Sequence, residues 1–150
     1  EKMKINTENF GKIEIESDKV IEFDLPILGF DKYTKFTIVN SLEDDIFYWL
    51  QSIEEKELSF IVINPFDFIE DYQIDISEKT KDKLMIDTDD ELIVYTLVVV
   101  RNEGELVTTN LKAPIIINAA KNRGGQIVLE TDYPTRYCLW EQEKMGEVSG

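Results

Sequence analysis

The chain has 150 residues, of which 43% are apolar, and its 31 acidic and 16 basic residues give a net charge of −15. A chain of this length forms one domain with its own hydrophobic core. The negative charge opposes binding to phosphate backbones and to anionic lipid, so we expect no direct contact with nucleic acid or membrane. It favours a basic protein partner, or it serves solubility alone.

The expected strands are runs in which apolar residues alternate with charged ones, or which are rich in β-branched and aromatic side chains. They cover residues 12–16, 20–23, 35–39, 46–50, 58–63, 91–101, 106–111, 115–118 and 126–130. The first two should form a hairpin through a turn at 17–19, and Arg123-Gly124-Gly125 should be the turn before the last. Residues 40–45 are expected to form an acidic loop, and Ser77 is a good N-cap for a short helix over 77–84.

This pattern predicts an all-β fold, a small antiparallel β-barrel or sandwich with one or two short helices, in a single domain over residues 1–140. Residues 141–150 are polar and are expected to be a flexible tail. The strand over 91–101 is apolar at consecutive positions, so both of its faces should be covered. The core is expected to contain Phe60, Ile93, Tyr95, Leu97, Val99, Ile115, Ile117 and Val128.

Much of the common catalytic chemistry is missing, because the chain has no histidine and one cysteine. Ser-His-Asp and Cys-His sites, and zinc sites built on His or several Cys, are therefore excluded. Cys138 lies in an apolar setting that predicts a buried thiol. The stretch Asp87–Glu91 resembles a calcium loop but lacks its glycine and its last glutamate. We expect no metal, no cofactor and no enzyme. With no signal peptide and no apolar run of about 18 residues, we expect a cytoplasmic protein.

Three segments carry distinctive motifs. The first runs from Val20 to Phe36 and contains Leu28-Gly29-Phe30-Asp31. The second contains Leu50-Gln51-Ser52 and Asn64-Pro65-Phe66-Asp67-Phe68-Ile69-Glu70-Asp71-Tyr72. The third contains Thr108-Thr109-Asn110-Leu111-Lys112-Ala113-Pro114-Ile115-Ile116-Ile117-Asn118, followed by Gly125-Gln126-Ile127-Val128-Leu129. Together, and in this order, they resemble the motifs of the flagellar assembly factor FliW family, among them D-P-x-x-F-x-P-D-Y and T-V-N-L-x-A-P-I-x-I-N.

The resemblance implies a non-catalytic protein that binds flagellin before export and also binds and antagonises the RNA-binding translational regulator CsrA. Export of flagellin would free the factor to capture the regulator, which couples flagellin export to flagellin translation. We expect a monomer when the protein is free. From the residues alone, two alternatives stay open: a carboxylate-based hydrolase, and a β-barrel that binds a small ligand in a lined interior.

The candidate partner-binding residues lie in two loops. Aromatic and acidic side chains gather between residues 66 and 72, a composition suited to interface anchors on an exposed loop. The alternative is that the two phenylalanines plug the end of the barrel. In the second loop, Asn110 either contacts a partner or stabilises its own turn. The candidates are Phe66, Phe68, Asp71, Tyr72, Asn110, Lys112 and Pro114.

Overall fold

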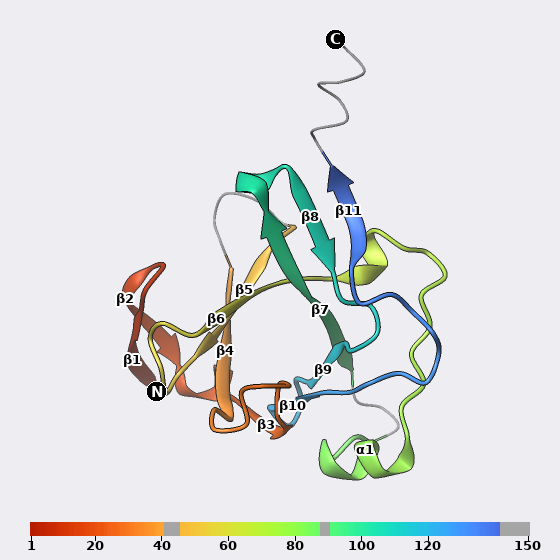
Figure 1. Cartoon of the computed structure of the whole chain (residues 1–150). Coiled ribbons are helices and arrows are strands. Elements are labelled where there is room, and N and C mark those ends of the chain that lie inside the picture. The colour runs from red at the N-terminus through yellow and green to blue at the C-terminus, as the bar shows by residue number, and fades with distance from the viewer. Residues whose placement is uncertain (41–45, 88–90, 142–150) are drawn as a thin grey trace.

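The computed structural model describes residues 1–40, 46–87 and 91–141. Within these ranges the chain forms eleven β-strands, one α-helix and three 3-10 segments (Figure 1). The strands are β1 (Lys2–Thr7), β2 (Gly11–Glu16), β3 (Ile21–Leu25), β4 (Lys35–Asn40), β5 (Tyr48–Ser52), β6 (Ser59–Ile63), β7 (Leu92–Arg101), β8 (Leu106–Thr109), β9 (Ile115–Asn118), β10 (Arg123–Gln126) and β11 (Tyr137–Glu141). The helix α1 covers Glu78–Lys83, and the 3-10 segments η1, η2 and η3 cover Ser17–Lys19, Pro65–Asp67 and Asn102–Gly104.

Seven strands close into a barrel in the order β7-β6-β5-β4-β3-β10-β9, because β9 also pairs with β7. The predicted all-β barrel is confirmed, with one difference: β3 and β10 run parallel, whereas the other neighbouring pairs of the barrel are antiparallel. Strands β8 and β11 continue the sheet beyond β7 and form with it an arm that projects from the barrel (Figure 1). Strands β1 and β2 form a separate hairpin.

Two glycines permit the parallel contact between β3 and β10. A Cβ atom on Gly125 would lie 2.6 Å from the Cβ of Leu25, and one on Gly124 would lie 3.0 Å from Cε1 of Phe23. Only residues without a side chain allow the two backbones to approach so closely. The predicted turn at 123–125 is therefore wrong. These residues are part of β10, and the turn precedes them at 119–122. The predicted strand over 126–130 is wrong as well, because β10 ends at Gln126.

The N-terminal pairing also differs from the prediction. Strand β2 pairs with β1, while β3 pairs with β4 and β10, so residues 12–23 do not form a hairpin. Strand β1 was not predicted, because its alternation is short and only Ile5 and Thr7 are buried in it. The predicted helix is confirmed, and Ser77 caps it: its Oγ accepts a 3.1 Å hydrogen bond from the Thr80 N–H.

The barrel interior is filled by aliphatic and aromatic side chains, with three of the eight predicted core residues, Tyr95, Ile115 and Ile117, buried in it. Two more, Phe60 and Leu97, pack against this core and are half-buried. The remaining three are exposed, and predicting them in the core was wrong: Ile93 is 36%, Val99 46% and Val128 59% exposed. Ile93 lies near the start of β7, Val99 lies in the projecting arm and Val128 lies past the end of β10, so each has an open face.

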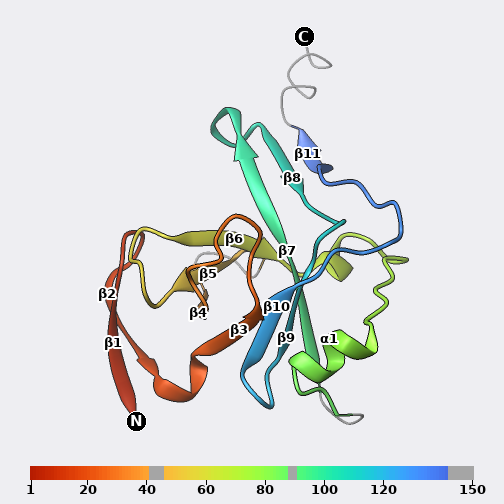
Figure 2. The same ribbon diagram turned by 60° about the horizontal axis from the view of Figure 1, so that its bottom comes forward.

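The prediction of a buried Cys138 is wrong as well. The thiol is exposed, because β11 is the last strand of its sheet. Of the expected acidic loop at 40–45 and the expected tail at 141–150, only Asn40 and Glu141 are described, and they are the last residues of β4 and β11. The rest of both segments, and residues 88–90 of the acidic stretch Asp87–Glu91, lie outside the described residues. Figure 2 shows α1 beside β9 and β10, where Nδ2 of Asn118 donates a 3.0 Å hydrogen bond to the Leu84 carbonyl. Within the described residues, no helix has the length and apolarity to span a membrane.

Candidate protein-binding site

The loop after β6, residues 64–72 (the aromatic loop), takes its shape from its first two residues. Oδ1 of Asn64 accepts a 2.9 Å hydrogen bond from the Phe66 N–H. Pro65 begins the 3-10 segment η2, and its carbonyl accepts hydrogen bonds from the N–H groups of Phe68 and Ile69. An Asn followed by Pro favours this kind of turn because the side chain replaces a backbone acceptor and the ring fixes φ.

Two aromatic side chains of this loop face solvent. Phe66 is 45% and Phe68 is 36% exposed, and neither belongs to the barrel core. The alternative in which they plug the end of the barrel is therefore wrong. Asp71 is also exposed, and it forms no hydrogen bond or ion pair with any described residue.

Tyr72, by contrast, is buried and anchors the loop. Its hydroxyl donates a 2.6 Å hydrogen bond to the Leu111 carbonyl. Its ring packs edge-on against Tyr133, with 4.9 Å between the ring centres, and lies 5.7 Å from the ring of Phe66. Burial, with a smaller contribution from Tyr133, raises the pKa of Tyr72 well above its ordinary value. The phenol therefore stays protonated and remains a donor.

The second candidate segment, residues 110–114, is a tight turn closed by its own asparagine. Oδ1 of Asn110 accepts hydrogen bonds from the N–H groups of Lys112, at 3.0 Å, and Ala113, at 3.1 Å. Nζ of Lys112 donates to the carbonyls of Glu130, at 3.4 Å, and Thr131, at 2.9 Å. Pro114 is buried. This turn is rigid because its side chains satisfy backbone groups that would otherwise be open.

The structure brings the two candidate segments together through the hydrogen bond from Tyr72 to Leu111. Beneath them lies a small apolar cluster of Ile69, Tyr72, Ile74, Leu111, Ile127, Leu129 and Tyr133. Sequence reasoning missed Tyr133, whose hydroxyl accepts a 3.0 Å hydrogen bond from the Gln73 N–H. An isolated aromatic residue just before Pro134, in an otherwise polar stretch, was the available signal.

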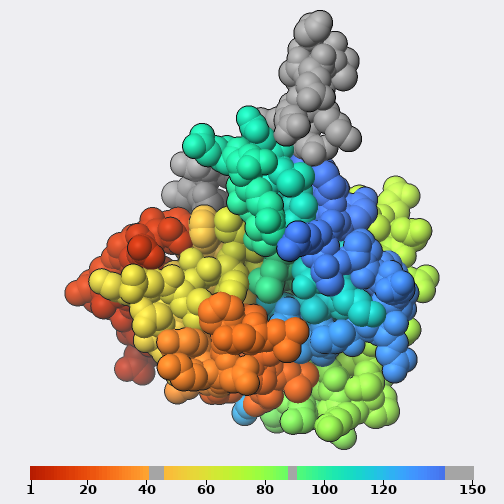
Figure 3. Space-filling view, in the orientation of Figure 1, coloured from red at the N-terminus to blue at the C-terminus, as the bar shows by residue number. Residues whose placement is uncertain are grey.

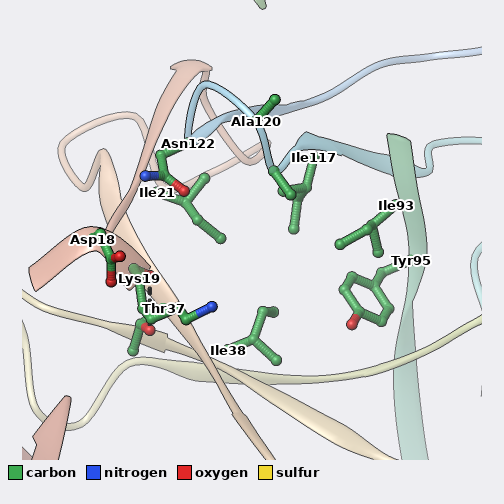
Figure 4. A pocket seen from close by; sticks show the side chains of 11 residues that line it. Asp18, Lys19, Ile21, Thr37, Ile38, Ile93, Tyr95, Ile117, Ala120 and Asn122 are labelled. Carbon is green, nitrogen blue, oxygen red and sulfur yellow. Dashed lines mark hydrogen bonds between the residues drawn. The ribbon is translucent and has the colours of Figure 1, made fainter. Parts of the chain in front are cut away.

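A separate pocket of about 660 Å³ opens at the mouth of the barrel, between β3 and β4 on one side and β7 and β9 on the other (Figure 4). Its lining is Asp18, Lys19, Ile21, Thr37, Ile38, Ile93, Tyr95, Ile117, Ala119, Ala120 and Asn122. The Tyr95 hydroxyl points into the pocket and forms no hydrogen bond with any described residue. Burial, with Tyr48 nearby, raises the pKa of Tyr95.

The mouth pocket does not carry the chemistry of the hydrolase alternative. A glycosidase needs two carboxyl groups facing one another across the substrate. Among the described residues, Asp18 is the one carboxylate in the lining, and it lies at the rim. The remaining polar groups of the lining belong to Lys19, Thr37, Tyr95 and Asn122, which could bind a ligand but do not form an acid–base pair.

Comparison with known proteins gives one consistent result. The family model described as FliW protein matches residues 4–139. The chain is 39% identical over 150 residues to the flagellar assembly factor FliW of Alkaliphilus metalliredigens (strain QYMF), covering 98% of this chain and 93% of that protein. It is 41% identical over 144 residues to the flagellar assembly factor FliW of Caldanaerobacter subterraneus subsp. tengcongensis, covering 95% of this chain and 96% of that protein.

The structural comparison agrees. A crystal structure of the flagellar assembly factor FliW matches with a TM-score of 0.84 and 34% sequence identity, covering 92% of this chain and 97% of that chain. Sequence and structure thus each match over most of the chain. The chain belongs to the FliW family of non-catalytic flagellar assembly factors.

Proposed function

We propose that this protein binds flagellin in the cytoplasm before export and, when free of flagellin, binds and antagonises the translational regulator CsrA. Membership in a family of flagellar assembly factors supports a role in flagellar assembly, the process to which both proposed interactions belong. The net charge of −15 supports the second half, because an RNA-binding regulator presents a basic surface and would be steered toward an acidic protein. Competition between the two partners for one protein would couple export to translation.

The observation that carries the proposal is the aromatic loop. Phe66 and Phe68 expose large apolar side chains next to the charge of Asp71 on a segment that Tyr72 fixes to the barrel. Aromatic anchors on a preorganised loop bind partners with a small entropic cost. We assign direct contact to Phe66, Phe68 and Asp71.

The other four candidates hold the contact residues in position and do not touch the partner themselves. Tyr72 and Asn110 hold the loop and the turn in place, Lys112 ties the turn to residues 130–131, and Pro114 lies buried beneath them. Substituting one of these four should therefore weaken partner binding together with local stability. Substituting an exposed loop residue should weaken partner binding alone.

The test uses purified flagellin and purified CsrA. Isothermal titration should show binding of each to this protein, and flagellin added to the complex with CsrA should release the regulator. An unrelated basic protein of similar charge, at the same ionic strength, controls for general electrostatic attraction. If neither partner binds, or if both bind without affecting one another, the proposed circuit is wrong.

The mouth pocket supports a second candidate function, binding of a small apolar ligand whose hydrogen-bond acceptor meets the Tyr95 hydroxyl. Its volume, and a lining that combines aliphatic side chains with a few polar groups, are typical of small-molecule sites. Ala120 is exposed at the rim, so Ala120→Trp should fill the pocket without disturbing the core. The fluorescent apolar probe ANS should bind the parent protein and not this variant. Equal fluorescence from both would argue against a ligand site there.

A further inference from the structure

A groove lies next to the two candidate segments and has no assigned role. Its volume is about 480 Å³, and it runs between the chain after β10, residues 127–131, and the segment that leads into α1. Its second wall is formed by Asp75, Ile76, Ser77 and Thr80. In the space-filling view, the blue segment after β10 and the green segment at α1 lie side by side (Figure 3). We call this feature the edge groove.

One wall of the edge groove is the open edge of a strand-like segment. The N–H of Ile127 donates to the Pro114 carbonyl at 3.0 Å, and the N–H of Leu129 donates to the Lys112 carbonyl at 2.8 Å. Successive peptide groups of an extended chain point to opposite sides, so those of Val128 face away from residues 112–114. The N–H and carbonyl of Val128 form no hydrogen bond with any described residue.

The opposite wall does not close this edge. The backbone groups of Ile74, Asp75 and Ile76 form no hydrogen bond with the described residues, so this segment does not pair with residues 127–131. Both segments nevertheless line the same groove, with the half-buried side chains of Ile76 and Ile127 among the lining. The segment 127–129 is thus paired on one side with residues 112–114 and left open on the other, and such an open edge is a template for another chain.

The negative charge of the edge groove favours a basic segment as the chain that binds there. Asp75 lines one wall and Glu130 the other, and neither carboxylate forms an ion pair with a described residue. Neither Lys nor Arg is among the described residues of the lining. A segment that carries Lys or Arg would therefore gain charge interactions on both sides while its backbone pairs with Val128.

We propose that the edge groove binds an extended, basic segment of a protein partner, which adds as a strand beside residues 127–131. The inference rests on the proposed function, because the groove would supply a contact surface for one of the two proposed partners. Val128, which is 59% exposed, would supply the pairing N–H and carbonyl, and its side chain would lie against the added strand. Pairing through the backbone supplies affinity, and the two carboxylates supply selectivity for basic residues.

The sharpest variant is Val128→Pro, with Val128→Thr as its matched control. Proline removes the free N–H and places its ring against the added strand, whereas threonine keeps the N–H and the β-branched shape. Because the N–H of Val128 has no acceptor among the described residues, Val128→Pro should melt like the parent. With CsrA as the probe, we expect Val128→Pro to bind about tenfold or more weakly and Val128→Thr to bind like the parent. Asp75→Lys should slow association, and added salt should reduce the difference.

Hydrogen exchange gives a readout that does not depend on a variant. In the free protein, the amides of Ile127 and Leu129 should be protected and those of Val128 and Glu130 should exchange fast, since neither has an acceptor among the described residues. Saturation with CsrA should protect Val128. If Val128 still exchanges fast in the saturated complex, or if a folded Val128→Pro protein binds like the parent, the inference is wrong. If the parent protein itself binds no CsrA, it is the proposed function that fails.

Discussion

Replacing Tyr72 with phenylalanine removes the hydroxyl group that links the aromatic loop to the turn at 110–114. The hydroxyl donates a 2.6 Å hydrogen bond to Leu111, and the side chain is 4% exposed. A hydrogen bond of this kind contributes about 0.5–1.5 kcal/mol net, and a buried carbonyl left without a donor costs about 1–3 kcal/mol. We therefore expect Tyr72→Phe to lower the free energy of unfolding by about 1–3 kcal/mol, with the barrel core unchanged.

The pH dependence of the same variant tests the burial of the phenol. Burial raises the pKa of Tyr72 above its ordinary value of 10.0 in the folded protein, whereas the unfolded chain releases this proton near that value. The stabilisation linked to the phenol is thus complete below pH 10.0 and is lost as the pH rises toward the folded pKa. Tyr72→Phe cannot show this loss, so its stability should fall less steeply at high pH than that of the parent.

Urea unfolding followed by tryptophan fluorescence measures both effects, at neutral pH and in a series above pH 10.0. Tyr137→Phe is the matched control, because Tyr137 is 36% exposed and its hydroxyl has no partner among the described residues. It should change stability by less than about 0.5 kcal/mol. If Tyr72→Phe is as stable as the parent at neutral pH and declines equally at high pH, the buried hydrogen bond from Tyr72 to Leu111 does not stabilise the protein as argued.

Three further predictions follow from other parts of the molecule. Asp71→Lys should leave the melting temperature unchanged and weaken flagellin or CsrA binding by about 2 kcal/mol in calorimetry. The control Glu8→Lys makes the same charge reversal on the β1–β2 hairpin and should not weaken binding. If the two variants bind equally well, the interface lies elsewhere. Gly125→Ala should cost about 1–3 kcal/mol in urea unfolding, because its Cβ would meet the Leu25 Cβ at 2.6 Å, and an unchanged midpoint would contradict the close approach. Association with a basic partner should slow as the Debye length shrinks from about 10 Å at 0.1 M salt to about 3 Å at 1 M, and salt-independent rates in stopped-flow would assign the acidity to solubility alone.

The strands that could be predicted from sequence are those whose own side chains form the core. In β9, for example, Ile115 and Ile117 are buried in the barrel and the residues between and beside them are also buried, so the apolar run and the structure coincide. The pairing of β3 with β10 has no such local signal. It joins Phe23 to Gly124, about a hundred residues later, and a Gly-Gly pair is ordinarily typical of a turn. The glycines are needed because of a strand far away in sequence, and a local pattern does not contain that information.

The candidate site shows the same division between local and distant information. The sequence singled out the aromatic loop and the turn at 110–114, which the structure places side by side, but it could not assign the aromatic residues within the loop to core or surface. Phe66 and Tyr72 are both aromatic residues of one loop, yet Phe66 is 45% and Tyr72 4% exposed. The difference arises because Tyr72 can place its hydroxyl on the Leu111 carbonyl, 39 residues later in the sequence, and Phe66 has no group for such a bond.

The position of the edge groove bears on how two partners could exclude one another. Leu129 lines the groove and Tyr72 anchors the aromatic loop, and both belong to the same apolar cluster. A partner bound at the loop and another bound at the groove would therefore compete directly if either is large, or act through this cluster if both are small. Linkage requires that the two partners weaken one another by the same factor in either case. A variant such as Tyr72→Phe separates the two mechanisms: it should leave direct overlap unchanged, whereas coupling through the cluster should become weaker.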